Sequence, residues 1–320
     1  MKALASYIMR GRFQALLVGV VAASLMWLVP PFSTVLGELA LGAVIALVTL
    51  RNGVREGGLI LFGTAAIAAV LALIAVQEGA FAAAMTGAVV VPVIPVLLLA
   101  YVLRKTISWG VTLSMAALLG ALVVLAVYAA TGDPTAFWQA RLAAMVEGLH
   151  AALNSASGSA ELAPADIEQA IATLNRGGEV LAPWMTGLFA VSMLTMFIGS
   201  LMLGRWWQAL LYNPGGWREE FYALRMPKTL AIASGVLLLA TVVLPGTAGQ
   251  LTADLVFVAG AVYLFPGLAI AHGWVRGKAY AAPALVVLYV LLFIIPHVSM
   301  LLAGVGWLDA WVNVRRRVSV

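Results

Sequence analysis

A succession of long apolar runs, separated by short segments that carry the charges, constrains the fold of this chain most strongly. About 20 apolar residues are enough for a helix to cross the hydrocarbon core of a bilayer. With 63% hydrophobic and 10% charged residues and a mean hydropathy of +1.05, the chain lies far from soluble domains, which carry about 25% charged residues. We therefore expect an all-α polytopic membrane protein. The apolar runs fall at 13–30, 35–50, 59–76, 80–103, 107–130, 182–203, 229–245, 251–274 and 281–314.

The last apolar run, 281–314, is too long for a single span. An interior proline removes a helical hydrogen bond and clashes with the preceding turn, so Pro296, followed by His297, is expected to break the run into 281–296 and 298–314. This gives ten transmembrane helices, with eight or nine as alternatives.

The distribution of cations gives an independent test of this topology. If the N-terminus is cytoplasmic, all of the 18 Lys and Arg residues except Arg141 and Arg176 fall on the cytoplasmic side. Cytoplasmic loops of membrane proteins carry such an excess of Lys and Arg. The pattern predicts a multi-pass protein of the bacterial cytoplasmic (inner) membrane with both termini in the cytoplasm.

This topology divides the chain into three parts: residues 1–130 with spans 1–5, an acidic periplasmic loop at 131–181, and residues 182–320 with spans 6–10. The outer loop is expected to hold two amphipathic helices, because apolar residues recur at spacings of three and four on each side of the linker SASGSAELAP. These helices would form either a lid or a structural cap. The apolar positions are Trp138, Leu142, Met145, Leu149, Leu153, Ile167, Ile171 and Leu174.

A cytoplasmic segment at 204–228 is the richest in charges and tryptophans. Trp residues favour the membrane interface, and Arg residues favour the cytoplasmic side. The turn residues at 213–216 predict a short in-plane helix that begins near Trp217. The candidates for interfacial anchoring or for docking a cytoplasmic protein are Arg205, Trp206, Trp207, Trp217, Arg218, Glu219 and Glu220.

Ionisable residues inside spans are costly and are therefore functional candidates. On the outer side we identify Glu38, Asp254 and His297 as candidate ligand-binding residues. An alternative for Glu38 and Asp254 is that each lies in the first turn of its span, where a carboxylate complements the helix dipole. His297 could instead satisfy backbone groups freed by the helix break. On the inner side, His272, Asp309 and Arg315 are candidates for a polar lock.

Signatures of catalysis are missing from the sequence. There is no cysteine, no GxSxG or HExxH motif, no phosphate-binding loop and no pair of histidines at metal-ligand spacing. We expect no enzymatic activity, no catalytic residues, no cofactor and no metal site. The scattered cations form no basic patch, so no nucleic-acid partner is expected.

Three segments carry a resemblance to a known family: FPGLAIAHGWVRGK at 265–278, GWLDAWVNVRRR at 306–317 and RWWQALLYNPGGWREEF at 205–221. In these segments the chain resembles the YybS-like predicted membrane proteins of bacteria, a family largely of unknown function. The resemblance covers most of the C-terminal half and implies a Gly-rich span end, a basic loop and a final span with an Arg-rich end. The matching positions are Gly267, His272, Arg276, Gly306, Asp309 and Arg315.

Two functions compete at this point. The leading hypothesis is transport or small-molecule binding within a helical bundle, with a cavity that opens outward beneath the acidic loop. The alternative is a non-transporting membrane scaffold or assembly protein that docks a cytoplasmic partner through loop 204–228. The expected partners are therefore the lipid bilayer, together with a small-molecule ligand or a cytoplasmic protein.

Overall fold

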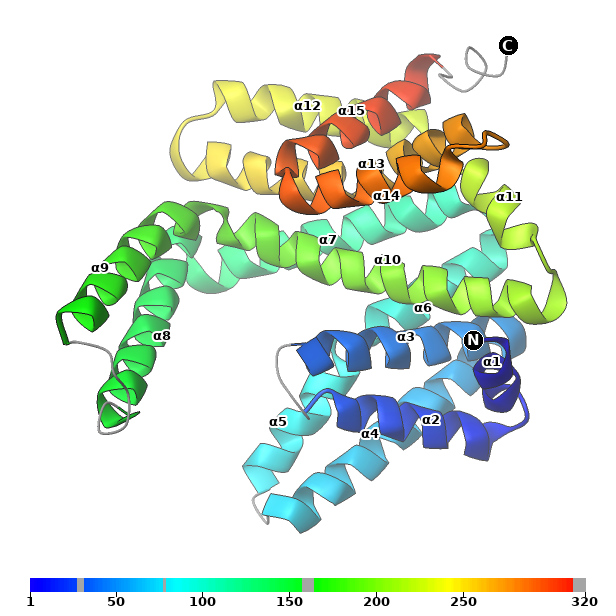
Figure 1. Ribbon diagram of the computed structural model, residues 1–320, viewed down its shortest axis with the longest axis horizontal. Coiled ribbons are helices and arrows are strands. Elements are labelled where there is room, and N and C mark those ends of the chain that lie inside the picture. Colours follow the sequence, from blue (N-terminus) through cyan, green and yellow to red (C-terminus); the bar gives the residue numbers. More distant parts are fainter. Residues whose placement is uncertain (28–31, 77–78, 157–163, 313–320) are drawn as a thin grey trace. The chain divides into compact units, whose positions relative to one another are not determined.

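The computed structural model describes residues 1–27, 32–76, 79–156 and 164–312, and every regular element in these ranges is a helix (Figure 1). The first half contains α1 (Lys2–Ile8), α2 (Arg12–Leu25), α3 (Phe32–Asn52), α4 (Val54–Val76), α5 (Gly79–Val90), α6 (Ile94–Thr106), α7 (Trp109–Thr131) and α8 (Pro134–Ala156). The second half contains α9 (Pro164–Leu181), the 3-10 helix η1 (Ala182–Trp184), α10 (Met185–Tyr212), α11 (Gly216–Tyr222), α12 (Lys228–Val243), α13 (Gly246–Val275), α14 (Ala281–Ile294) and α15 (Pro296–Val312).

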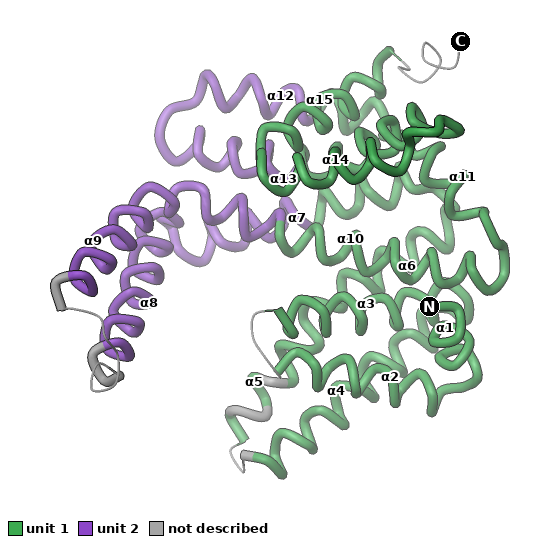
Figure 2. Tube along the Cα trace, viewed as in Figure 1, with its two compact units in different colours: residues 1–119, 192–233, 259–320 green, residues 120–191, 234–258 purple. Residues whose placement is uncertain are grey.

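The chain divides into two compact units that do not follow chain order (Figure 2). Unit 1 comprises residues 1–119, 192–233 and 259–320, and unit 2 comprises residues 120–191 and 234–258. Helices α7, α10, α12 and α13 each contribute residues to both units.

The core of unit 1 is built around α3. Every residue of α3 from Leu41 to Leu50 is buried, and α3 packs against α2, α4 and α6. A helix that is apolar on all sides is stable only when all its faces are covered by protein or lipid. Here protein covers the C-terminal half of the helix.

Unit 2 contains the segment for which the sequence predicted two amphipathic helices. Both helices are confirmed: α8 and α9 pack against each other as a hairpin. Part of the predicted apolar stripe faces away from this contact, because Met145 is 75% exposed and Leu149 is 44% exposed. Most of the predicted linker lies outside the described residues.

Large apolar side chains are exposed along several helices, as expected for surfaces that face lipid. On α14, Phe293 is 92% exposed, and on α12, Val242 is 83% exposed. Soluble monomers rarely expose continuous apolar surface on this scale. The exposure therefore agrees with the apolar composition in describing an integral membrane protein.

The prediction of ten spans is not confirmed. Within the described residues, six helical stretches are long and apolar enough to cross a membrane, and eight if each of two bent helix pairs forms one span. The expected break before Pro296 is confirmed, since α14 and α15 meet there at 115°. Of the other predicted spans, α12 has only 16 residues and α2 forms a bent pair with α1. The six stretches are Phe32–Asn52, Val54–Ala75, Thr86–Thr106, Trp109–Thr131, Asp166–Tyr212 and Gly246–Val275.

Candidate functional site

The most constrained ionisable group in unit 2 is the carboxylate of Asp254 on α13. Its residue is only 1% exposed. One carboxylate oxygen, Oδ2, accepts a hydrogen bond of 2.8 Å from the hydroxyl of Tyr128 on α7, and Oδ1 accepts one of 3.0 Å from the backbone N–H of Gly187 on α10. Asp254 thus joins three helices that are far apart in the sequence.

Gly187 is required for this arrangement because α10 approaches α13 closely there. A Cβ atom at this position would lie 2.7 Å from Oδ1 of Asp254 and 3.4 Å from Cβ of Phe257. A larger residue would push the Asp254 carboxylate away from the backbone N–H of residue 187 that donates to it. Glycine at 187 therefore allows a backbone donor to reach a buried carboxylate.

No positive charge balances Asp254 in the part of the chain that the structure describes. The ion pairs found there join Arg12 to Glu56, Arg205 to Glu220, Arg225 to Asp309 and Arg276 to Glu219. The partners of Asp254 are a phenol and an amide, both neutral. A buried carboxylate with neutral partners can bind a proton or a cation, because it carries charge that the protein itself has not neutralised.

The surroundings of this carboxylate link it to the α8–α9 hairpin. Trp138 on α8 donates a 2.9 Å hydrogen bond from Nε1 to Oγ1 of Thr186, the residue before Gly187. Thr186 is buried, and the Trp138 ring also packs against Phe189 on α10. The hairpin is therefore attached to the same turn of α10 that holds Asp254.

The alternative of a first-turn carboxylate, considered from the sequence, is wrong for both Asp254 and Glu38. Helix α13 begins at Gly246, so Asp254 lies more than two turns inside it, and α3 begins at Phe32, so Glu38 also lies beyond the first turn. Both helices start earlier than the apolar runs suggested because small and polar residues continue them. A dipole at the helix N-terminus does not account for either carboxylate.

The three candidate ligand residues do not share a unit. Glu38 is half-buried on α3 and His297 is exposed at the start of α15, and both belong to unit 1, whereas Asp254 belongs to unit 2. Their predicted roles in ligand binding stay predictions. Asp254 alone has a defined set of polar contacts that explains its burial.

The residues expected to form an inner polar lock have separate partners. Nδ1 of His272 lies 2.9 Å from the Leu268 carbonyl, and Nε2 lies 3.3 Å from the Tyr289 hydroxyl. Asp309, which is 1% exposed, lies beside Arg225, with 3.6 Å between Oδ2 and Nε. Arg315 lies outside the described residues. The nearby cation that Asp309 was expected to have is therefore present, but it comes from the 204–228 segment.

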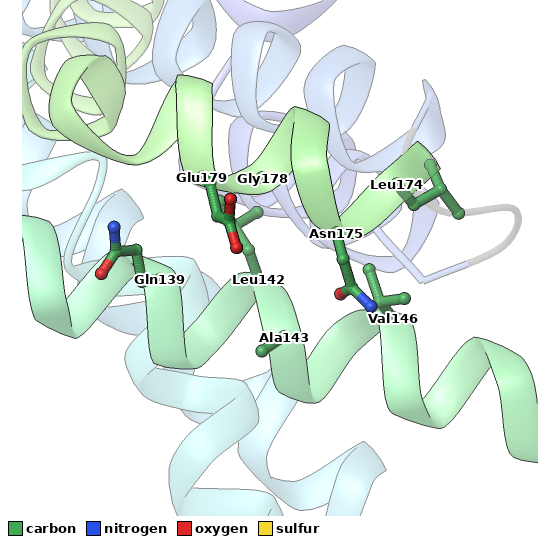
Figure 3. A pocket seen from close by; sticks show the side chains of 8 residues that line it. All are labelled: Gln139, Leu142, Ala143, Val146, Leu174, Asn175, Gly178 and Glu179. Carbon is green, nitrogen blue, oxygen red and sulfur yellow. The ribbon is translucent and has the colours of Figure 1, made fainter. Parts of the chain in front are cut away.

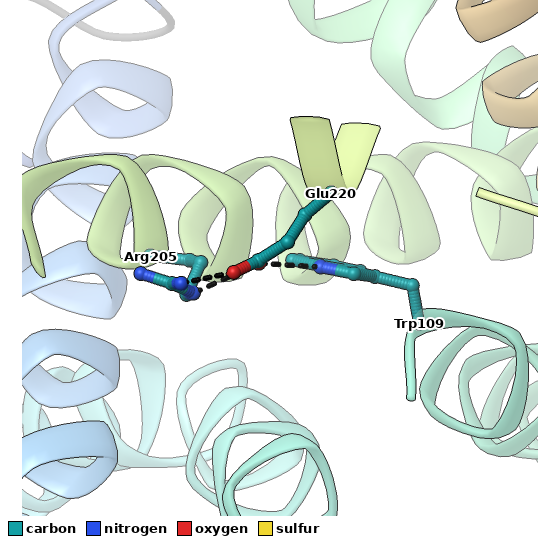
Figure 4. Close-up of polar contacts among 3 residues, drawn as sticks. All are labelled: Trp109, Arg205 and Glu220. Atoms are coloured by element: carbon teal, nitrogen blue, oxygen red, sulfur yellow. Dashed lines mark hydrogen bonds and ion pairs between the residues drawn. The ribbon is translucent and has the colours of Figure 1, made fainter. Parts of the chain in front are cut away.

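The charges of the 204–228 segment are largely used within unit 1. The guanidinium of Arg205 on α10 donates two hydrogen bonds to the carboxylate of Glu220 on α11, one of them 3.0 Å from Nε to Oε2 (Figure 4). The indole N–H of Trp109 on α7 also donates to Glu220, at 3.3 Å. Glu220 thus ties the short helix α11 to α7 and α10.

The remaining residues of this segment have similar internal contacts. Glu219 pairs with Arg276 at 2.8 Å, Trp217 packs edge-to-face against Trp109, and Arg218 donates a hydrogen bond to Tyr222. Trp207 is only 3% exposed in the core of unit 1, and Trp206 packs against that core. Helix α11 itself confirms the short helix predicted near Trp217, after the turn at Gly215 with its φ of +90°.

Several residues of these sites were missed by reasoning from the sequence. In the sequence, nothing distinguishes Tyr128 from the other tyrosines or Gly187 from the many glycines in apolar segments. The positions of Trp109 and Arg225 in the sequence likewise give no indication that these residues contact Glu220 and Asp309. Only the packing of distant helices brings these groups together.

Comparisons with known proteins agree with the membrane architecture. A family model described as a predicted membrane protein (DUF2232) matches residues 16–310. The comparisons with curated proteins and with solved structures find no match to the chain. The matched region includes Asp254, the α8–α9 hairpin and the 204–228 segment, and it covers nearly the whole sequence. The chain belongs to the DUF2232 family of predicted membrane proteins.

Proposed function

We propose that this protein binds a small molecule and moves it across the bacterial inner membrane, with Asp254 as the group that takes up a proton or a cation during transport. The observation that carries this proposal is the burial of the Asp254 carboxylate between neutral hydrogen-bond donors. Ionisable residues in membrane helices are rare and mark ion and proton pathways in many transporters. The protein would act by binding rather than by catalysis.

A proline inside one helix and a break between two others support the same proposal. Pro266 lies inside α13, the helix that carries Asp254, and residues 91–93 separate α5 from α6. Prolines inside membrane helices free backbone carbonyls, which are tolerated where protein or a water-lined cavity satisfies them. Interrupted helices near binding sites are a recurring feature of secondary transporters.

Docking of a cytoplasmic partner through loop 204–228 has weaker support. A docking surface needs side chains that are free to pair with the partner. In unit 1, the carboxylates of Glu219 and Glu220 and the guanidinium of Arg205 already pair with one another or with Arg276. The segment acts instead as a clamp that holds α11 on neighbouring helices. Within its family, the chain would belong with the YybS-like proteins, because the motif at 205–221 that it shares with them lies in this 204–228 segment.

The proposal is tested with proteoliposomes that contain the full-length protein. An inward pH gradient is applied in the presence of mixed amino acids, amines and vitamins, and the contents of the vesicles are measured by mass spectrometry. We expect the wild-type protein to accumulate at least one solute, and Asp254→Asn to lose this accumulation, because the amide keeps an oxygen acceptor for Gly187 but cannot carry charge. Asp309→Asn, a matched change of the other buried aspartate, should retain it.

Two results would contradict the proposal. Vesicles with the wild-type protein could match empty vesicles for every solute, with and without the gradient. Alternatively, Asp254→Asn could accumulate solutes as well as the wild-type protein does, which would make Asp254 a structural residue.

A further inference from the structure

A groove runs between the two helices of the hairpin in unit 2 (Figure 3). It has a volume of about 530 Å³ and is partly open to its surroundings. Small-molecule sites in proteins commonly have volumes of about 300–1,000 Å³. The groove is lined by Gln139, Leu142, Ala143, Val146, Leu174, Asn175, Gly178 and Glu179.

The lining has two chemical parts. Leu142 and Val146 of α8, with Leu174 of α9, provide apolar surface, whereas Gln139, Asn175 and Glu179 provide polar groups (Figure 3). The only formal charge in this lining is the carboxylate of Glu179. A ligand that fits this lining has an apolar body and a polar or positively charged end.

The charge around the groove selects a cation. Among the described residues of 131–181, two arginines stand against five acidic residues. Neither arginine lines the groove, and the guanidinium of Arg141 lies over the Phe137 ring, 5.3 Å from its centre. Glu179 forms no ion pair among the described residues. A concave site with one sign of charge attracts ligands of the opposite sign.

The groove is also connected to Asp254 through α8. Gln139, at one end of the groove, directly follows Trp138 in α8. The indole N–H of Trp138 donates a hydrogen bond to Thr186. The next residue, Gly187, donates its N–H to Asp254. A ligand that shifts α8 therefore acts on the turn of α10 that holds the buried carboxylate.

From these observations we infer that the α8–α9 groove binds a small organic cation, with the positive charge at Glu179 and the apolar body against Leu142, Val146 and Leu174. This inference rests on the proposed function and names the class of its substrate. The groove is the first binding site, and Asp254 is the group that responds to its occupation.

The test measures binding of phenyltrimethylammonium to the full-length protein in nanodiscs of phosphatidylcholine, a lipid without net charge. Benzenesulfonate, of similar size and opposite charge, is the ligand control. We expect saturable binding of the cation and none of the anion. Glu179→Gln should weaken binding by about fivefold, the effect of losing one solvent-accessible ion pair. Glu168→Gln, which removes an exposed carboxylate of α9 that does not line the groove, should leave binding unchanged.

Each contrary outcome has a defined meaning. The inference is overturned if the wild-type protein binds the cation and the anion equally or binds neither, or if Glu179→Gln binds the cation as well as the wild-type protein does. Asp254→Asn should still bind the cation in nanodiscs, because the groove does not include it. A failure of solute accumulation in proteoliposomes with normal cation binding would therefore contradict the proposed function and leave the groove in place.

Discussion

Each of the two units contains a buried aspartate, and the two differ in how their charge is compensated. Asp309 in unit 1 and Asp254 in unit 2 are both 1% exposed. Arg225 approaches Asp309 with its guanidinium and also donates a 3.0 Å hydrogen bond to the Asp309 carbonyl. Among the described residues, the partners of the Asp254 carboxylate are the hydroxyl of Tyr128 and the N–H of Gly187.

Close helix packing is common to both sites, so it does not explain why one aspartate pairs with a cation and the other does not. In unit 1, a Cβ atom on Gly306 would lie 2.9 Å from the backbone nitrogen of Gly267, and Gly306 lies one turn before Asp309 on α15. In unit 2, Gly187 plays the equivalent part beside Asp254. Glycine brings helices together at each carboxylate, but within the described parts of the two units a cation pairs with the carboxylate of unit 1 alone.

This difference indicates distinct roles for the two carboxylates. Removing one partner of a buried ion pair leaves an unbalanced charge, which is strongly destabilising. A buried carboxylate without a cation already carries that cost in the native protein. The proposed function therefore assigns the change of charge to Asp254 and a structural role to Asp309.

The largest effect is expected from Arg225→Gln. This change leaves the buried Asp309 carboxylate without its cation, and it should lower the free energy of unfolding by about 2–4 kcal/mol, somewhat less than for a fully buried pair because Arg225 is partly exposed. Thermal unfolding in detergent, followed by tryptophan fluorescence, measures the change. Arg218→Gln, at an exposed arginine of α11, is the control and should stay within about 0.5 kcal/mol of the wild type. Equal losses for the two variants would show that Asp309 does not depend on Arg225.

A matched pair of substitutions is expected to give the next largest effect. Asp309→Asn removes one charge of the ion pair and should cost about 1–2 kcal/mol, less than for a fully buried pair, because the Arg225 that it leaves behind is partly exposed to solvent. Asp254→Asn removes a charge that no cation balances, and it should change stability by less than about 1 kcal/mol. The same unfolding measurement compares them. Equal destabilisation by Asp254→Asn and Asp309→Asn would contradict the proposed difference between the two aspartates.

A further small effect is expected from Tyr128→Phe. It removes one of the two donors to Asp254 and should lower stability by about 1 kcal/mol, the typical value of a single hydrogen bond. In the background of Asp254→Asn the same change should cost less, because the hydrogen bond then involves no charged group. Tyr280→Phe, at a tyrosine that is 55% exposed, is the control. A cost for Tyr128→Phe that is the same in both backgrounds would show that the phenol does not interact with the Asp254 charge.

Much of the fold follows from local sequence patterns. The break at Pro296, the two helices of the hairpin and the short helix near Trp217 were all predicted, because prolines, turn residues and apolar periodicity act over only a few residues. The number of membrane spans could not be predicted reliably from these local patterns. Apolar runs such as 13–30 and 229–245 form helices that are bent or short, and the bend is a property of packing rather than of hydropathy.

The candidate site was predictable only in part. Asp254 stood out because a carboxylate is rare in an apolar segment. Its helix was assumed to begin too late, and this gave Asp254 a position near the helix terminus that it does not have. The groove at Glu179 was not predicted, since it depends on how α8 and α9 pack along their length.

The sequence by itself determined that this protein is a bundle of membrane helices with an acidic hairpin and that two aspartates lie in apolar segments. It did so because hydrophobicity and helix signals are local properties of a chain. Only the tertiary structure decided which aspartate forms an ion pair with a cation. Tyr128 and Asp254 are 126 positions apart, and Arg225 and Asp309 are 84 positions apart. Contacts over such separations depend on which helices pack together, and no pattern within a single helix specifies that choice.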